Sequence, residues 1–178
     1  MLTEADVAGA AEALRAARIV VVQLQHPPAT TLAGARCMRA AGRRVVLDGV
    51  PERHVADELV ADADADVLRA DAKETRLPAG TTVDDLATAL GVGRDLLRRG
   101  PSLVALAVGR RPRQRVRLGG RAGHRPVGPY DRGGHRGGRD AFIAVLTAGL
   151  LPGEAPETLA QRTVAAASAT VGHPGGRR

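Results

Sequence analysis

The side chains that could hold a ligand or accept a proton occur at only a few points of the sequence. Carboxylates follow two predicted strands, as Asp48 and as the pair Asp71 and Glu74, and another, Asp140, stands at the start of a late predicted helix. On position alone each has an ordinary explanation: Asp140 as a helix N-cap, Glu74 as a solvated charge on a helix, and Asp48 as part of a turn. Residue type and position therefore leave a catalytic and a structural interpretation open.

The sequence does not favour the His residues as metal ligands or Cys37 as a nucleophile. His124 and His135 have no carboxylate or Cys nearby at a recognisable ligand spacing, which argues against a metal site there. Cys37 lies on an Ala-rich helical face and is interpreted as a buried structural thiol rather than a nucleophile. As the single Cys of the chain, it also excludes an intramolecular disulfide.

The basic charge of the chain is confined to one segment. Residues 110–139 hold ten Arg and one acid, a local charge of +9, so the rest carries −2 of the formal net charge of +7. With eight Gly and little apolar periodicity, the segment is expected to be disordered, because it cannot bury enough apolar area to offset its ordering entropy. Arg/Gly segments also bind RNA through phosphates and stacking, but here only Tyr130 supplies an aromatic ring, so nucleic acid is a disfavoured partner.

Length and composition fit one domain without aromatic packing. The chain has 178 residues and is 44% hydrophobic, with one Tyr, one Phe and no Trp, so its core must use Ala, Val and Leu. No signal peptide is visible, and no apolar run is long enough to span a bilayer. These features predict a soluble cytoplasmic protein without a membrane partner.

Predicted strands and helices alternate along the chain. Short apolar runs typical of strands buried on both faces occur at 19–22, 44–48, 66–69 and 102–108. This alternation predicts an α/β fold with a parallel sheet and helices on both faces, whose ligands lie at the carboxyl ends of the strands. Helices are predicted after Thr3, from Thr30 or Thr31 to Gly42, and over 54–63, 83–90, 94–99, 140–151 and 157–171.

Taken together, several segments resemble the C-terminal part of ribokinase-like (PfkB-type) carbohydrate kinases. The resemblance covers nearly the whole chain except the basic segment, and it depends on the order and spacing of the pieces. It implies a ribokinase-like parallel sheet flanked by helices and truncated at its N-terminus. The matching pieces are residues 20–25, 40–48, 68–74, 103–109 and 140–146, followed by the helix that ends at Thr170-Val171-Gly172.

The resemblance implies phosphoryl transfer from ATP to a hydroxyl group of a sugar or a similar alcohol. In that family the base is an Asp that closes a Gly-rich turn at a helix N-terminus, and the matching residue here is Asp140. The turn contains Gly137 and Gly138, and the backbone N–H groups of such a turn hold the negative charge of the phosphate.

The resemblance also assigns residues to the nucleotide and its metal ion. Glu74 matches the acid associated with Mg²⁺ and the phosphates, and Asp71 stands where an Asn is common. Gly109 matches the turn that leads into the nucleotide site, and Asp48-Gly49 matches a strand end near the phosphates. The implied partners are ATP, Mg²⁺ and a sugar-like small molecule, and a homodimer is compatible with the resemblance.

Two features depart from the family pattern. The N-terminal part of such a kinase, which supplies most of the sugar site and its lid, has no counterpart in the sequence. The turn before Asp140 reads Gly137-Gly138-Arg139 where the family has Gly-Ala-Gly. Arg139 cannot adopt the positive φ of a glycine cheaply, and its side chain is expected to crowd the phosphate seat.

Codon arithmetic leads to the hypothesis that residues 110–139 are a frameshifted translation. When each codon is read from its second base, residues 130–139 permit Thr-Thr-Val-Val-Asp-Thr-Gly-Ala-Gly immediately before Asp140, which restores the family's turn. Shifting GC-rich codons by one base also turns Val, Ala and Asp into Arg and Gly. The hypothesis therefore explains the local charge and the scarcity of aromatic residues together.

The sequence thus predicts an α/β core over 1–109, the basic segment over 110–139, the last helices of the same domain over 140–171, and a tail over 172–178. The predicted function is that of an ATP-dependent carbohydrate kinase, and the truncated chain itself is expected to bind nucleotide weakly or to be inactive. Two alternatives stay open: an RNA- or polyanion-binding protein that uses the basic segment, and a non-catalytic α/β remnant.

Overall fold

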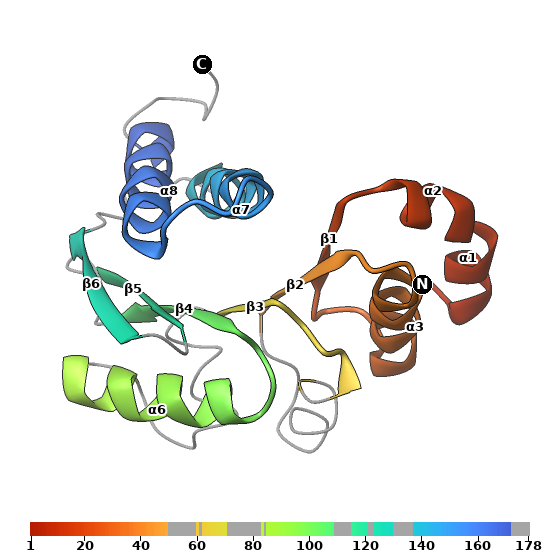
Figure 1. Cartoon of the computed structure of the whole chain (residues 1–178), viewed down its shortest axis with the longest axis horizontal. Helices are drawn as coiled ribbons and strands as arrows, with labels where there is room; N and C mark the ends of the chain where they lie inside the picture. Colours follow the sequence, from red (N-terminus) through yellow and green to blue (C-terminus); the bar gives the residue numbers. More distant parts are fainter. Residues whose placement is uncertain are drawn as a thin grey trace.

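A six-stranded sheet runs through the molecule with its strands in chain order, β1-β2-β3-β4-β5-β6 (Figure 1). The computed structural model describes residues 1–49, 60, 62–70, 83, 85–108, 115–120, 123–129 and 137–171. The first four strands are parallel, β5 is antiparallel to β4, and β6 is antiparallel to β5. The strands are β1 (Ile19–Gln23), β2 (Arg44–Asp48), β3 (Val67–Ala70), β4 (Leu103–Val108), β5 (Arg115–Gly120) and β6 (Gly123–Pro129).

Helices cover both faces of the sheet, as predicted. On one face α3 and α6 pack against the sheet, and on the other α7 and α8 do so (Figure 1). No helix among the described residues combines the length and hydropathy needed to cross a membrane. The helices are α1 (Glu4–Gly9), α2 (Ala11–Ala16), α3 (Pro28–Ala40), α6 (Leu86–Arg98), α7 (Gly137–Leu150) and α8 (Pro156–Val171).

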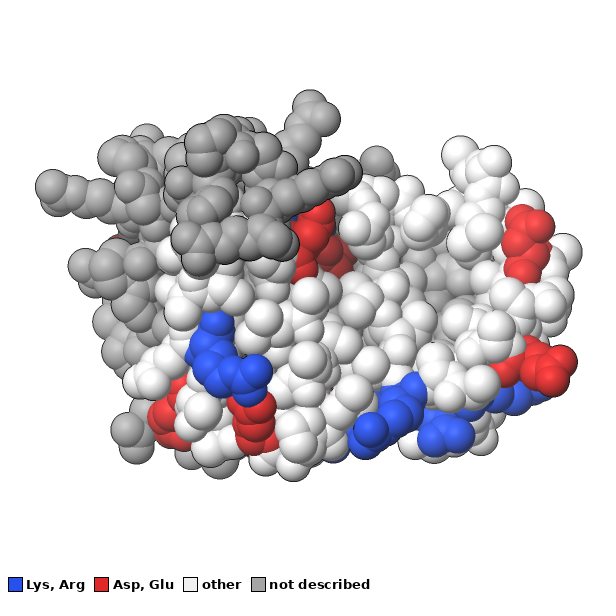
Figure 2. Space-filling model, turned by 90° about the horizontal axis from the view of Figure 1, so that it is seen from above, with Lys and Arg blue, Asp and Glu red and all other residues white. Residues whose placement is uncertain are grey.

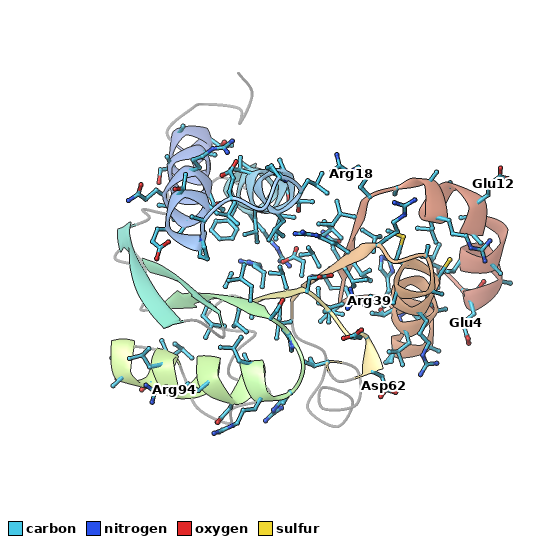
Figure 3. All side chains as sticks on the ribbon, viewed as in Figure 1. Glu4, Glu12, Arg18, Arg39, Asp62 and Arg94 are labelled. Atoms are coloured by element: carbon cyan, nitrogen blue, oxygen red, sulfur yellow. The ribbon has the colours of Figure 1, made fainter. Side chains whose placement is uncertain are left out.

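The core forms two apolar layers because successive strand residues point to opposite faces. Val45 and Leu47 of β2 pack in the same cluster as Met38 of α3, whereas Val46 packs in the same cluster as Leu146 of α7. Figure 3 shows side chains filling the space between the sheet and its helices. The predicted buried strands β2 and β3 are confirmed, since nearly every residue in them is buried.

Strand β1 differs from the expectation of a strand buried on both faces. It lies at one edge of the described sheet, and its residues are half-buried or exposed. Val21 in the middle of the strand is 37% exposed. An apolar run therefore marked the strand correctly, but it did not reveal that the strand would lie at an edge.

Within the basic segment, the expectation of disorder is wrong for residues 115–120 and 123–129. These residues form β5 and β6 and extend the sheet beyond β4. Antiparallel pairing supplies backbone hydrogen bonds that depend little on side-chain type. A signal was present, because Arg115-Val116-Arg117-Leu118 alternates charged and apolar residues with the period of a strand.

Several helix boundaries also differ from the predicted ones. The stretches at 83–90 and 94–99 are joined in α6, which continues through Gly91 and Gly93. Helix α3 begins at Pro28, earlier than the predicted start at Thr30 or Thr31, because Pro is tolerated in the first turn, where its missing N–H costs nothing. The helix predicted after Thr3 is divided at Ala10 into α1 and α2. Of the helix predicted over 54–63, all but residues 60, 62 and 63 lie outside the described residues.

Charged side chains are sparse on the face seen in Figure 2. Most of its described surface is formed by residues other than Lys, Arg, Asp and Glu, and the blue and red side chains lie in small groups. The segment with the largest excess of Arg, residues 110–139, lies mainly outside the described residues or in strands whose side chains are not described. The described part of this face therefore shows no continuous basic patch.

Candidate active site at the carboxyl edge of the sheet

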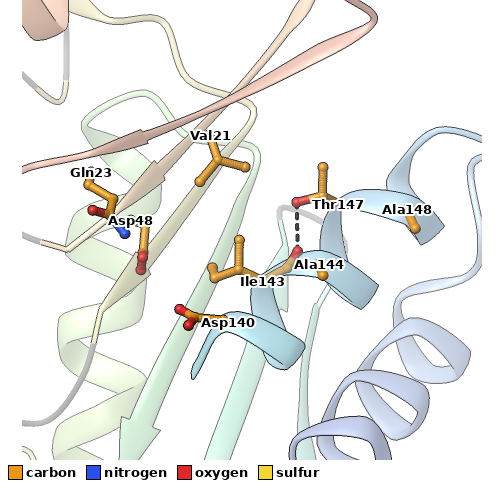
Figure 4. Close-up of a pocket in the computed structure, with 8 residues that line it drawn as sticks. All are labelled: Val21, Gln23, Asp48, Asp140, Ile143, Ala144, Thr147 and Ala148. Atoms are coloured by element: carbon orange, nitrogen blue, oxygen red, sulfur yellow. Dashed lines mark hydrogen bonds between the residues drawn. The ribbon is translucent and has the colours of Figure 1, made fainter. Parts of the chain in front are cut away.

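A pocket of about 380 Å³ lies between the carboxyl ends of β1 and β2 and the first turns of α7 (Figure 4). Gln23 and Asp48 are the last residues of β1 and β2, so parallel pairing brings them to the same edge. This is the edge at which ligands of parallel α/β sheets bind. The pocket is lined by Val21, Gln23, Asp48, Asp140, Ile143, Ala144, Thr147 and Ala148.

Asp140 is the fourth residue of α7 and its side chain is exposed. Because α7 begins at Gly137, three residues earlier than predicted, Asp140 is not the N-cap of this helix. Figure 4 shows its carboxylate on the side of α7 that faces Asp48 and Gln23. Gly137 and Gly138, predicted to lie in a turn before the helix, instead form the start of α7, and with Asp140 they lie at a helix end whose dipole favours anions.

The wall of the pocket along α7 is mainly apolar. Ile143 is buried, whereas Ala144 and Ala148 are exposed one and two turns beyond Asp140. The Thr147 hydroxyl donates a hydrogen bond to the Ile143 carbonyl at 2.6 Å, so it is engaged within its own helix (Figure 4). Asp140, Asp48 and Gln23 are the pocket residues with charged or amide side chains.

Asp48 is buried and forms ion pairs with two arginines, Arg69 and Arg139. Its Oδ1 lies 3.1 Å from Nη1 of Arg69, and its Oδ2 accepts from Nε of Arg139 at 3.1 Å and lies 3.0 Å from Nη2. Asp48 is 2% exposed and Arg69 is 4% exposed. Both carboxylate oxygens are thus engaged by guanidinium groups, which makes Asp48 a structural anion rather than a ligand for a cation.

The chain after Asp48 turns sharply at Gly49. Gly49 has φ of 110°, which L-residues with a side chain rarely adopt. Its N–H donates to the Arg69 carbonyl at 2.8 Å, and the Asp48 carbonyl accepts from the Leu24 N–H at 3.0 Å. The predicted strand end at Asp48-Gly49 is therefore confirmed, and hydrogen bonds join it to its neighbours on both sides.

The expected backbone strain at Arg139 is absent. Among the described residues, Asp64 is the one residue other than glycine with a positive φ, so Arg139 does not occupy the left-handed region. It lies within the first turn of α7, where helical dihedrals suit any residue, and its guanidinium reaches Asp48. The correction follows from the earlier start of the helix.

Three of the predicted nucleotide-site residues, Gly109, Asp71 and Glu74, lie outside the described residues. In the described part of the chain no three His, Cys, Asp or Glu side chains converge on a common point. The pairing of Asp48 with Arg69 and Arg139 was not predicted from the sequence. For Arg69 a signal existed, since an Arg inside a buried strand requires a partner, and its register partner on β2 is Asp48.

Comparison with known proteins gives matches in structure and none in sequence. No family model matches the chain, and no curated protein matches its sequence. The solved structure of Sa239 superposes with a TM-score of 0.82 at 21% identity, covering 98% of this chain and 57% of that one. Arabidopsis thaliana ribokinase complexed with ribose and ATP gives 0.76 at 20% identity, covering 98% and 55%. The 2-dehydro-3-deoxygluconokinase of Thermotoga maritima gives 0.74 at 17% identity, covering 98% and 61%.

The chain spans little more than half the length of these solved structures. Their likeness extends over nearly all of it, and it includes the parallel strands with helices on both faces. At these levels of identity the likeness concerns the fold. The chain therefore has the ribokinase-like α/β fold over a part of its usual length.

Proposed function

We propose that this chain carries part of the active site of an ATP-dependent kinase that phosphorylates a hydroxyl group of a sugar or a similar alcohol, with Asp140 as the base. The observation that carries the proposal is the position of Asp140, exposed in the first turn of α7 and lining a pocket at the carboxyl edge of the sheet. Solved structures with the same fold include a ribokinase with ribose and ATP and a pyridoxal kinase in complex with pyridoxal.

In the proposed reaction the carboxylate of Asp140 accepts the proton of the attacking hydroxyl group. The hydroxyl oxygen forms a bond to the terminal phosphorus of ATP, the bond from that phosphorus to the bridging oxygen breaks, and ADP leaves. A carboxylate at an exposed position suits this role because it stays within reach of a bound alcohol.

The negative charge of the transferred phosphate would lie at the start of α7. The backbone N–H groups of Gly137 and Gly138 belong to the first turn, where they have no acceptor within the helix. For Mg²⁺ the proposal relies on Glu74, since both oxygens of Asp48 are engaged by arginines. The ion would neutralise phosphate charge when bound.

The proposal is tested by measuring nucleotide binding and phosphoryl transfer separately. We expect Mg-ATP to raise the melting temperature of the protein, because a ligand that binds the folded state stabilises it. We expect Asp140→Asn to retain this shift but to abolish ADP formation with ribose, 2-dehydro-3-deoxygluconate or pyridoxal as acceptor. Asp95→Asn is the matched control, since Asp95 is an exposed carboxylate on α6.

Two results would contradict the proposal. The absence of any thermal shift with Mg-ATP would favour a non-catalytic remnant of the fold. Salt-sensitive binding to generic RNA that is lost on deleting residues 110–139 would favour a polyanion-binding protein instead.

The frameshift hypothesis is a proposal about the gene and is tested there. In the shifted reading position 139 is Gly, so the Arg139 contacts with Asp48 would disappear from the site. The nucleotide sequence of the locus, including the stretch before the codon for Met1, decides the matter. If the shifted frame does not encode the Gly-Ala-Gly turn, the hypothesis is wrong.

A further inference from the structure

Helix α7 is attached to both ends of strand β2. At the C-terminal end of the helix, the Leu150 carbonyl accepts a hydrogen bond from the guanidinium group of Arg44, the first residue of β2. At the N-terminal end, Nε and Nη2 of Arg139 lie 3.1 and 3.0 Å from Oδ2 of Asp48, the last residue of β2. The helix that carries Asp140 is therefore fixed against one strand at both ends.

In the attachment at the N-terminal end of α7, Asp48 is held in place by several other contacts. Its carboxylate is also held by Arg69 of the neighbouring strand at 3.1 Å, and the two residues are register partners. The backbone carbonyl of Asp48 accepts a hydrogen bond from the N–H of Leu24, the residue after β1. The N–H of the following residue, Gly49, donates to the carbonyl of Arg69 on β3. With 2% exposure and contacts on both sides, the Asp48 side chain has little freedom to move.

Arg139 transmits this anchoring to the proposed base. It is the residue immediately before Asp140, and its partner Asp48 is 91 residues away in sequence. Asp48 and Asp140 line the same pocket. The ion pair between Asp48 and Arg139 thus connects the end of β2 to the first turn of α7, next to Asp140. This connection restricts where the Asp140 carboxylate can lie relative to the pocket.

We propose that Asp48 is a positioning residue for Asp140, which it holds at the pocket through its ion pair with Arg139. The significance of this role rests on the proposed function of Asp140 as the base. The competing explanation is that the Asp48–Arg139 pair contributes to overall stability alone. If Asp48 is a positioning residue, breaking the pair should loosen the first turn of α7 alone. If the pair contributes only to overall stability, breaking it should loosen the whole fold.

The test compares Arg139→Gln with Arg139→Lys by amide hydrogen exchange. The informative amides are those of residues 141–144, because their helical acceptors are the carbonyls of residues 137–140 in the first turn of α7. We expect Arg139→Gln to accelerate exchange of these amides at least tenfold while the amides of β2, β3 and β4 change by less than twofold. We expect Arg139→Lys to restore most of the protection, since it keeps a cation opposite Asp48.

Arg162→Gln is the matched control, because it removes a guanidinium group from an ion pair with Glu154 that lies away from the pocket. It should leave exchange at residues 141–144 unchanged. The proposal is overturned if Arg139→Gln leaves these amides as slow as in the parent protein. It is equally overturned if exchange rises uniformly throughout the sheet, which indicates loss of global stability.

A second set of variants separates this inference from the proposed function. Asp48→Asn weakens the contacts with both Arg69 and Arg139 and should accelerate the same amides. Adding Arg139→Gln to Asp48→Asn should not accelerate them further, because the two changes share the Asp48–Arg139 contact. None of these measurements needs nucleotide or acceptor. If Mg-ATP gives the parent protein no thermal shift, the proposed function fails, while the exchange pattern still decides whether Asp48 positions the first turn of α7.

Discussion

Asp48 and Arg69 stand opposite each other on β2 and β3, and their side chains form an ion pair of 3.1 Å in the interior of the sheet. Both residues are nearly inaccessible to solvent. The pair lies at the carboxyl edge of the sheet, where Asp48 also lines the pocket. Its energetic role follows from the cost of leaving one charge buried without its partner.

Removal of the Arg69 side chain should destabilise the protein strongly. Arg69→Met leaves the Asp48 carboxylate buried with one of its two guanidinium partners, and breaking a buried pair in this way costs about 3–5 kcal/mol. Urea unfolding followed by circular dichroism measures the change. Arg98→Met is the control, because the exposed Arg98–Asp95 pair on α6 should contribute less than about 1 kcal/mol. Equal effects of the two changes would contradict this account of the Asp48–Arg69 pair.

Gly149 near the end of α7 should not tolerate a side chain. A Cβ at this position would overlap Cδ1 of Leu159, which is 1% exposed and packed in the core, and would approach Glu154. We expect Gly149→Ala to destabilise the fold by about 1–3 kcal/mol through overpacking between α7 and α8.

Gly91→Ala should have the opposite effect on the stability of the protein. Gly91 lies inside α6 with no atom within 4 Å of an added Cβ, so alanine should stabilise the helix by about 0.5–1 kcal/mol. Thermal unfolding of both variants should show shifts of opposite sign. Stabilisation by both changes would mean that the packing between α7 and α8 is looser than described, whereas destabilisation by both would contradict the expectation for Gly91.

The N-terminus of α6 should respond to acid. Asp85 caps this helix, and hydrogen bonds from the backbone N–H and the hydroxyl of Thr88 lower the pKa of Asp85 below its ordinary value of 3.8. A carboxyl group with a lowered pKa in the folded state contributes stability above its unfolded value, and this contribution disappears as the pH falls through the folded value. The contribution should therefore be full well above pH 3.8 and should decline as the pH falls from 3.8 through the lowered pKa of the folded state.

Asp85→Asn isolates this contribution, because Asn also caps helices but does not titrate. Unfolding midpoints measured between pH 7 and pH 2.5 should fall less steeply in this variant than in the parent protein. Identical pH profiles would show that the Asp85 cap is not formed in solution.

The helix α7 should depend on Leu146 for its attachment to the sheet. Leu146 is fully buried in the apolar layer between α7 and β2, and Leu→Ala changes at such sites cost about 2–5 kcal/mol. Leu2→Ala is the matched control, because Leu2 is 46% exposed and should change stability by less than about 0.5 kcal/mol. Chemical denaturation of both variants gives the comparison.

The positions of the parallel strands could be predicted from the sequence to within about one residue. Runs such as Val45-Val46-Leu47 are continuous and apolar because β2 is covered by helices on both faces. Strand β5 was not predicted, because its Arg and Gly residues obscure a strand that pairs through its backbone. The burial of β1 was overestimated, since the apolar content of a strand does not reveal whether a neighbour covers its edge.

The candidate site was predictable in part. Asp140 and the end of β2 at Asp48 were both identified, and the structure places them in one pocket. The contact between Asp48 and Arg139 was not, because it joins residues 91 positions apart and depends on where α7 begins. A three-residue difference in the start of the helix removed the expected strain at Arg139 and directed its side chain to Asp48.

The open side of β1 has a consequence for how the protein behaves at high concentration. In the described sheet β1 pairs with β2 alone, so alternate backbone N–H and C=O groups of Ile19–Gln23 face outward beside the exposed side chain of Val21. Such a border is a template on which another extended polypeptide can add. We therefore expect the isolated chain to associate through this edge strand unless another polypeptide covers it. A charged residue in place of Val21 should delay precipitation without disturbing the core.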